Sequence, residues 1–116
     1  MIKKLLKPDG EWLPVHQEIN GKTLLPKDFI IPRLMINGST YTVLSEKPDE
    51  GIIRVKGRNL DIYSTDGTNN GRHLTAIYQI ENSKLTICYN LKGDVYPQAF
   101  YTAHHPAYFL SVFKKI

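Results

Sequence analysis

Apolar residues recur along the chain in short alternating runs that are separated by turn-forming residues. Such runs appear about every 8–12 residues, with Gly, Asn, Asp or Pro between them. No long segment shows the i, i+3, i+4, i+7 spacing of an amphipathic helix. The pattern predicts an all-β chain of about eight or nine strands, joined mostly by tight turns, with at most one short helical turn.

The first predicted strand, Glu11–Ile19, contains Pro14, which cannot donate to a strand ladder and therefore marks an edge, a bulge or a bend. The following segment, Lys22–Ile31, is less regular. Within it, Pro26-Lys27-Asp28 is typical of one short helical turn, because proline suits the first turn of a helix. Pro32 ends this segment.

Three hairpins are predicted next, and the first has the clearest signal. Its Asn37-Gly38 pair favours a type I′ turn, in which both central residues need a positive φ. The hairpins join Arg33–Ile36 to Ser39–Leu44, Ile52–Lys56 to Leu60–Ser64 around Gly57-Arg58-Asn59, and Arg72–Glu81 to Lys84–Tyr89 through Asn82-Ser83. The remaining predicted pieces are a polar turn at Glu46–Glu50, a long polar loop at Thr65–Gly71, a strand near Gln98–Tyr101, a turn at Thr102–Pro106 and a last strand at Tyr108–Lys114.

Sequential hairpins imply an up-and-down meander, and rolling it shut removes the exposed sheet edges. We therefore expect one domain over residues 1–116, an antiparallel β-barrel preceded by a lead-in at residues 1–9. A barrel of about eight strands is just wide enough to fill with side chains or to hold one small ligand.

Several short motifs then occur in a particular order along the chain. They are Gly10-Glu11-Trp12, Ile19-Asn20-Gly21-Lys22, Ala76–Ile80 with Lys84–Tyr89, and Pro97–Phe100. In this order they resemble a family of small lipocalin-like bacterial domains of unknown function, found chiefly in planctomycetes. Family members tend to carry Arg before the proline, where this chain has Tyr96, so no role of that arginine is transferred.

The resemblance implies a calycin barrel, with the tryptophan of the Gly-x-Trp signature closing one end. By similarity Trp12 is this plug, and Lys114 or Lys115 of the last strand covers its face through a cation–π contact. The alternative is that Trp12 is simply a large core aromatic. Both interpretations place it inside the barrel.

The composition indicates the class of protein and the cellular compartment to expect. Apolar residues make up 41% of the chain, which suits a globular core, and the single cysteine, Cys88, excludes an intramolecular disulfide. We expect a cytoplasmic protein, or an exported one whose signal peptide has been trimmed, because Met1–Pro8 lacks the apolar run of a signal peptide. No segment approaches the about 20 apolar residues of a membrane helix, so no membrane insertion is expected.

Residues with reactive side chains do not form a recognisable catalytic or metal-binding pattern. His104-His105 is expected in a turn, and no Cys/His spacing resembles a zinc site. Cys88 lies mid-strand, as a small buried residue does. Asp49-Glu50 is assigned to a turn and Asp61 to the surface. The sequence has no cofactor fingerprint either, so we expect neither an enzyme nor a bound metal or cofactor.

The favoured hypothesis is a non-enzymatic binding barrel for a small apolar or amphipathic ligand. Trp12 is assigned as the floor of the pocket, and Tyr78 and Tyr89 as its wall, because each shares a strand face with apolar residues. Arg54 is an anion anchor if it points inward and a solubilising residue if it points outward.

Two alternatives remain open. One is an inhibitor or immunity-type module that contacts a protein partner through Thr65–Gly71 and Ala103–Pro106. The other is nucleic-acid binding by Arg54, Lys56 and Arg58 with Tyr63, favoured by a net charge of +4. It ranks third, because the basic residues are dispersed and the strands outnumber those of a five-stranded oligonucleotide-binding barrel.

Overall fold

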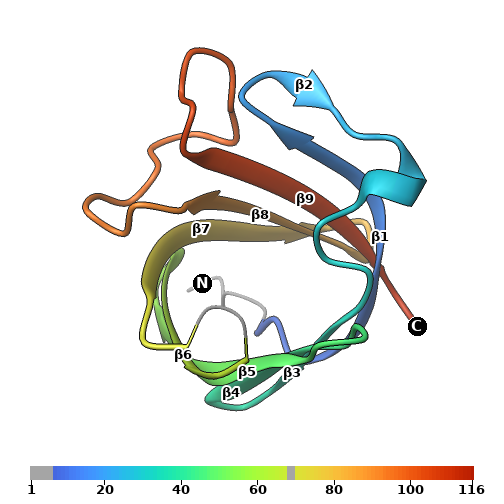
Figure 1. Ribbon diagram of the computed structural model, residues 1–116, viewed down its shortest axis with the longest axis vertical. Coiled ribbons are helices and arrows are strands. Elements are labelled where there is room, and N and C mark those ends of the chain that lie inside the picture. The colour runs from blue at the N-terminus through green and yellow to red at the C-terminus, as the bar shows by residue number, and fades with distance from the viewer. Residues whose placement is uncertain (1–6, 68–69) are drawn as a thin grey trace, which may run out of the picture.

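The structure, a computed structural model, describes residues 7–67 and 70–116 (Figure 1). The predicted lead-in and the predicted loop at 65–71 thus lie partly outside the described residues. The strands are β1 (Gly10–Ile19), β2 (Lys22–Thr23), β3 (Leu34–Asn37), β4 (Thr40–Val43), β5 (Asp49–Lys56), β6 (Asn59–Asp66), β7 (His73–Glu81), β8 (Lys84–Asn90) and β9 (Tyr108–Lys115). A 3-10 turn, η1 (Pro26–Asp28), lies between β2 and β3 and matches the predicted helical turn.

Within the described residues, these nine strands form one antiparallel sheet in the order β2-β1-β3-β4-β5-β6-β7-β8-β9. The sheet closes because β1 also pairs with β9, from Trp12 opposite Lys115 to Ile19 opposite Phe109. Eight strands make the barrel, and the short β2 pairs only with the end of β1. In Figure 1 the strands form a ring, because the view looks into the open barrel. The predicted up-and-down β-barrel, consistent with a lipocalin-like fold, is confirmed.

Alternation along each strand sends one set of side chains into the barrel and the other set outward. The inward set forms a continuous apolar core. Its buried members are Trp12, Ile31, Leu34, Ile36, Tyr41, Ile53, Leu60, Ile62, Ala76, Tyr78, Leu85, Ile87, Tyr89, Phe109 and Phe113. A one-residue slip of any strand would turn its inward set to water, so this core fixes the register.

Of the edge, bulge or bend expected at Pro14, the structure has a bulge in β1. The pairing with β9 shifts between Pro14, which is opposite Phe113, and His16, which is opposite Val112. The extra residue restores the inward direction at Gln17, opposite Ser111. Proline is tolerated here because the ladder is already interrupted.

The first of the three predicted hairpin turns differs from expectation, whereas the third is centred where it was predicted. The first has Gly38-Ser39 at its centre rather than Asn37-Gly38, and only Gly38 has a positive φ, so it is not the predicted type I′ turn. The shift places Tyr41 opposite Ile36 inside the barrel, where an aromatic ring buries more apolar surface than Ser39 would. At Asn82-Ser83 both residues have positive φ, of 52° and 63°, as a type I′ turn requires.

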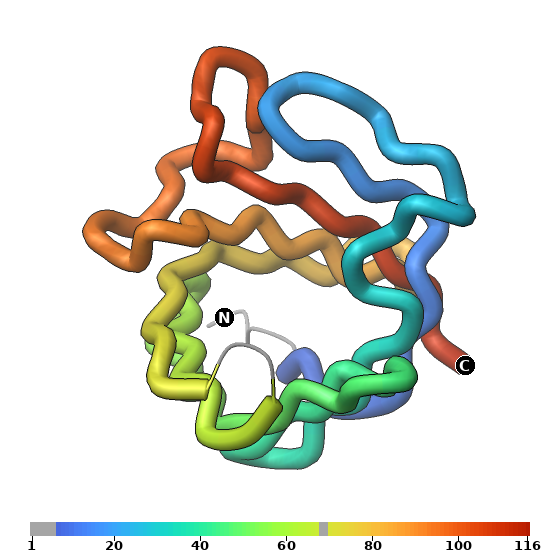
Figure 2. The backbone as a smooth tube through the Cα atoms, viewed as in Figure 1, coloured from blue at the N-terminus to red at the C-terminus, as the bar shows by residue number. Residues whose placement is uncertain are grey.

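The strand predicted near Gln98–Tyr101 is wrong. Residues 91–107 form an irregular connection between β8 and β9, which lies outside the barrel wall in Figure 2. Because β1 and β9 close the sheet, no free edge is left there for another strand. The segment instead packs Tyr96 and Phe100 against Ile77, Cys88 and Leu110 on the outer face of β7, β8 and β9.

Trp12 is buried at the end of the barrel where β1 begins and β9 ends, opposite Lys115. Its side chain is 2% exposed, and its indole Nε1 donates to the carbonyl oxygen of Pro8 at 2.9 Å. The ammonium of Lys115 lies 5.5 Å from the ring centroid, which makes Lys115, of the two predicted lysines, the residue that covers the indole. Gly10 has φ +134°, and a Cβ there would lie 2.8 Å from Cε of Lys115. The Gly-x-Trp motif therefore has a local steric cause.

Candidate functional site

The barrel is hollow at the end opposite Trp12. A cavity of about 300 Å³ opens there, within the range of small-molecule sites. Its wall is mostly aliphatic and aromatic. The lining residues are Ile30, Ile31, Leu34, Ile36, Tyr41, Val43, Ser45, Lys47, Asp49, Ile53, Ile62, Leu74, Ile87, Tyr89, Leu91 and Phe109.

The loop between β2 and β3 forms part of the mouth. Ile30 and Ile31 line the cavity there, and Gln17 of β1 holds both in place. The Gln17 Nε2 donates to the carbonyl oxygen of Ile31 at 2.8 Å, and its Oε1 accepts from the Ile30 amide at 2.7 Å and the Ile31 amide at 3.3 Å. Gln17 is fully buried, so these three bonds satisfy groups that water does not reach.

One carboxylate, that of Asp49, lies in the cavity wall. Asp49 is the first residue of β5 and is paired with Val43 of β4. The Ser64 hydroxyl donates to its Oδ1 at 2.6 Å, and the Tyr41 hydroxyl lies 3.4 Å from its Oδ2. Three neighbouring strands thus bring two hydroxyl donors to one carboxylate.

Gly51 makes room for this arrangement. It lies opposite Tyr41 in the β4–β5 ladder. A Cβ on Gly51 would lie 2.7 Å from a ring carbon of Tyr41 and also too close to the Tyr63 backbone. Glycine in a strand interior often marks such a close approach. The absence of a side chain therefore lets the Tyr41 ring lie across the strand and reach Asp49.

Both tyrosines of the cavity remain protonated phenols at neutral pH. Burial raises the pKa of Tyr41 to about 12, and the negative charge of Asp49 contributes in the same direction. Burial likewise raises the pKa of Tyr89. The hydroxyls are therefore hydrogen-bond donors within an apolar wall, which is the composition of many ligand pockets.

The structure places the predicted binding residues in three different settings. Tyr89 lines the cavity and stacks on Phe109 with ring centroids 5.5 Å apart. Trp12 and Tyr78 are buried in the core but are not among the lining residues. Arg54 is exposed on the outer face of β5, with its guanidinium over the Tyr63 ring. Of the four, only Tyr89 contacts the cavity, and the ligand-binding roles themselves stay predictions.

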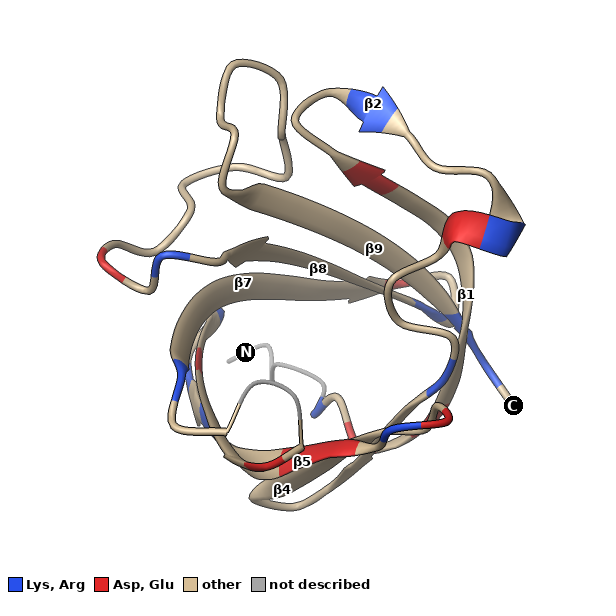
Figure 3. Cartoon of the chain, viewed as in Figure 1, with Lys and Arg blue, Asp and Glu red and all other residues tan. Residues whose placement is uncertain are grey.

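Asp49 was assigned to a turn in the sequence interpretation, and that assignment is wrong. Asp49 and Glu50 begin β5, and Asp49 points inward with Gly51 and Ile53 because alternate residues share a face. The alternation of Asp49, Gly51 and Ile53 is the sequence signal that could have placed Asp49 on the inner side. Figure 3 shows acidic residues at the start of β5, beside the barrel opening.

No protein-family model matches this chain, and no curated protein matches its sequence. The function therefore has to be inferred from the site itself.

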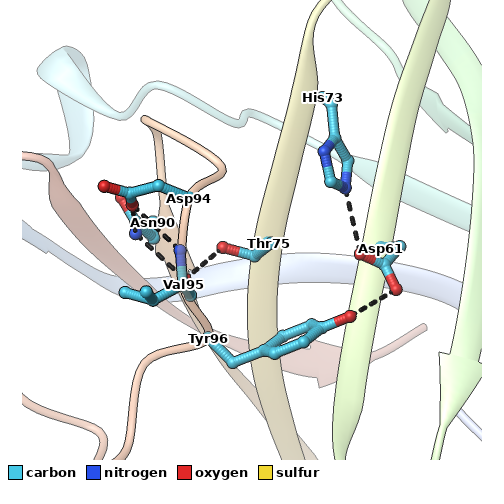
Figure 4. Close-up of polar contacts among 7 residues, drawn as sticks. All are labelled: Asp61, His73, Thr75, Asn90, Asp94, Val95 and Tyr96. Carbon is cyan, nitrogen blue, oxygen red and sulfur yellow. Dashed lines mark hydrogen bonds and ion pairs between the residues drawn. The ribbon is translucent and has the colours of Figure 1, made fainter.

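A second polar cluster lies on the outer face, centred on Asp61 (Figure 4). The Tyr96 hydroxyl donates to Asp61 Oδ2 at 2.6 Å, and His73 Nε2 lies 3.0 Å from Asp61 Oδ1. The His73 ring in turn stacks on Tyr63 with centroids 4.5 Å apart. Both neighbours direct polar atoms at the carboxylate, and no serine or cysteine contact to His73 is present among the described residues. The cluster connects the 91–107 segment to β6 and β7.

Further bonds fasten the same segment. The Thr75 hydroxyl and the Asn90 amide both donate to the Val95 carbonyl oxygen, and the Asn90 amide also donates to Asp94 Oδ1 at 2.6 Å. These contacts, drawn in Figure 4, explain why a segment without regular secondary structure holds a fixed position. The hydrogen bond between Tyr96 and Asp61 fastens the same segment, so we assign the Asp61 cluster a structural role.

The Tyr96 contact should be sensitive to acid. Burial raises the pKa of Asp61, but hydrogen bonds from Tyr96 and His73 outweigh it, and the net pKa is lowered. A lowered folded-state pKa contributes stability above the unfolded-state value, near 4, and that stability is lost as pH falls through the folded-state value. Tyr96→Phe is therefore expected to lower stability near pH 7 and to speed amide exchange at Val95. The difference from wild type should shrink below about pH 4. A difference that is constant down to pH 2 would contradict the contact.

The other reactive groups lie apart from the cavity. Cys88 is fully buried beneath the 91–107 segment, and burial raises the pKa of its thiol. His104 has φ 64° in the predicted turn, next to His105, which stacks on Tyr108. Among the described residues no group of three metal-ligating side chains converges, and no helix is long and apolar enough to span a membrane.

Proposed function

We propose that this protein is a binding barrel that takes a small apolar or amphipathic molecule into its cavity, and that it acts without catalysis. The observation that carries the proposal is the hollow end of the barrel, about 300 Å³ in volume and lined mainly by aliphatic and aromatic side chains. A soluble domain of this size ordinarily fills its core at close to crystal packing density. An open apolar cavity is therefore a feature that ligand binding explains.

The arrangement of the two ends supports the same proposal. Trp12 and Lys115 lie at one end of the barrel, and the cavity opens at the other, between the β2–β3 loop and the β4–β5 connection, where a ligand would enter. Tyr89 and Phe109 form an aromatic wall, and Tyr41 and Asp49 offer polar contacts near the mouth. The resemblance to planctomycete lipocalin-like domains, which rests on the ordered set of motifs from Gly10-Glu11-Trp12 to Pro97–Phe100, is part of this proposal.

The two alternatives have less support. A filled barrel with ordered apolar loop residues would favour the protein-interaction hypothesis, whereas this barrel holds a cavity and residues 104–106 are exposed. For nucleic-acid binding, Arg54 is stacked over Tyr63, but Asp61 is paired with Arg54 in the ladder and adds negative charge to the same face.

The test compares two neighbouring isoleucines that point to opposite sides of β5. Ile53 lines the cavity, whereas Ile52 is 41% exposed on the outer surface. Straight-chain alcohols from hexanol to decanol are titrated into ¹⁵N-labelled protein, and amide shifts are followed by NMR. We expect saturable shifts at Ile87 and Tyr89. Ile53→Phe should fill the cavity and weaken binding at least about tenfold, and Ile52→Phe should leave it unchanged.

Circular dichroism establishes that both variants fold, so that lost binding is not mistaken for lost structure. Absence of saturable binding by any alcohol would overturn the proposal. Equal effects of the inner and outer substitutions would overturn it as well, because binding would then not take place in the cavity.

A further inference from the structure

The cavity is chemically uneven, since one side of a mostly apolar wall carries the carboxylate of Asp49. We infer that the ligand is an amphipathic cation, with a protonated amine or quaternary ammonium head against Asp49 and an apolar tail directed toward Ile53 and Ile62. This inference rests on the proposed binding function and specifies the chemical class of its ligand.

The carboxylate of Asp49 has capacity for a further partner. An ionised carboxylate offers about four acceptor positions, and Ser64 and Tyr41 occupy two of them. Within the described residues, the ion pairs are Arg33 with Glu11, His16 with Glu18, and His73 with Asp61. Asp49 thus has no cationic side chain within ion-pair distance in that part of the chain. A charge held in an apolar wall is costly unless it is paired, and a cationic head group supplies the pairing.

The hydroxyl groups around Asp49 fix the direction of its carboxylate. The Ser64 hydroxyl binds one carboxylate oxygen, and the Tyr41 hydroxyl lies near the other. Burial raises the pKa of Tyr41 to about 12, so this phenol stays a donor and does not compete as an anion. Ser64 is itself buried and belongs to the adjacent strand, which holds the group rigidly.

Aromatic rings complete the head-group environment. Tyr41, Tyr89 and Phe109 all line the same cavity, and Tyr89 and Phe109 are stacked on each other. The faces of such rings attract ammonium groups, and aromatic cages with a nearby carboxylate suit quaternary or primary amines. An anionic head would meet the Asp49 charge and the negative faces of these rings together.

Lys47 is the one cationic side chain among the lining residues of the cavity. It is exposed at the β4–β5 connection, whereas Asp49 is partly buried. Water and salt screen an exposed charge much more than a buried one, so the field of Asp49 dominates inside the cavity. Because the charge of Lys47 is opposite to that of Asp49, a Lys47 variant also serves as a control.

The distance between Asp49 and the apolar residues deeper in the barrel limits the length of the ligand. Ile53 lies four residues beyond Asp49 on the same face of β5, which is about 13 Å at the usual rise of a strand. Beyond this level the barrel is filled by Leu60, Leu85 and Phe113, each fully buried. A head group at Asp49 therefore leaves room for an apolar tail of limited length and for nothing bulky behind it.

The experiment compares three probes that share one tail, octylamine, octanol and octanoate, by isothermal titration calorimetry at pH 7. We expect octylamine to bind at least about tenfold more tightly than octanol, and octanoate to bind most weakly. Asp49→Asn keeps the size of the side chain and should reduce octylamine affinity by about 10- to 100-fold while leaving octanol affinity within about twofold. Retained octanol binding shows that the variant is folded.

Lys47→Met gives the opposite test at an exposed position. It should strengthen octylamine binding and weaken octanoate binding further, because it removes the positive charge from the cavity lining. If octanol binds as tightly as octylamine, or if Asp49→Asn keeps the preference for the amine, the inference is overturned while the proposed binding function stands. If none of the three probes binds, the proposed function is overturned and this inference with it.

Discussion

Replacing Trp12 by alanine is expected to lower the free energy of unfolding by about 3–5 kcal/mol, as truncation of a buried Trp does. The indole is 2% exposed, and its removal would leave a void at the closed end, where Lys115 covers it. It would also leave the Pro8 carbonyl without its donor. Domains of this size are stable by only about 5–15 kcal/mol, so much of the total would be lost. Urea unfolding followed by far-ultraviolet circular dichroism measures this, since Trp12 is the only tryptophan and fluorescence would vanish with it.

Two matched variants separate the contributions of the indole. Trp12→Phe keeps a ring but removes the Nε1 donor and should cost less than the alanine variant. Lys115→Met keeps the packing of the stem and removes the cation above the ring, which should cost about 1 kcal/mol or less. A loss below about 1 kcal/mol for Trp12→Ala would show that the indole does not hold that end of the barrel together.

Replacing Gln17 by leucine is expected to lower the free energy of unfolding by about 2–4 kcal/mol, because two amides and one carbonyl would lose their partners. Gln17 is fully buried and holds Ile30 and Ile31 at the mouth of the cavity. Leucine has a similar size but neither donates nor accepts. The β2–β3 loop should therefore open, and hydrogen exchange at the Ile30 and Ile31 amides should accelerate more than exchange in the strands.

The same substitution at Gln98, which is exposed, gives the control. Gln98→Leu should change stability by less than about 0.5 kcal/mol. Since Ile30 and Ile31 line the cavity, Gln17→Leu should also weaken alcohol binding, and Gln98→Leu should not. Unchanged exchange at Ile30 and Ile31 in the Gln17 variant would contradict the anchoring role.

The two ends of the barrel have different roles. The closed end carries stability through Trp12 and its cover, whereas the open end carries the cavity, Asp49 and the loop that Gln17 holds. The outer cluster around Asp61 fastens the 91–107 segment and stands apart from both. Substitution of Asp49 should thus affect binding more than folding, substitution of Trp12 the reverse, and substitution of Gln17 both.

Much of the fold was predictable because strand signals are local. Alternating apolar positions, Gly and Asn at turns, and Pro14 at a bulge each act within a few residues, and the structure has all of them. The type of the turn at Gly38 was not predictable, because Tyr41 packing against Ile36 across the sheet decides it. The strand wrongly predicted near Gln98–Tyr101 also reflects tertiary packing. In the closed barrel the apolar residues of this segment cover the outer face and do not extend the sheet.

The sequence by itself determined that this chain is a meander of hairpins and that Trp12, Tyr78 and Tyr89 are inside, since side-chain direction along a strand follows from a period of two residues. Only the tertiary structure decided which end is hollow, that Arg54 lies outside, and that Asp49 meets Tyr41 and Ser64. The reason is that closure of β1 on β9 and the stagger of the strands set which inward residues share a level. Such pairings depend on the whole ring of strands, and no local stretch of sequence contains them.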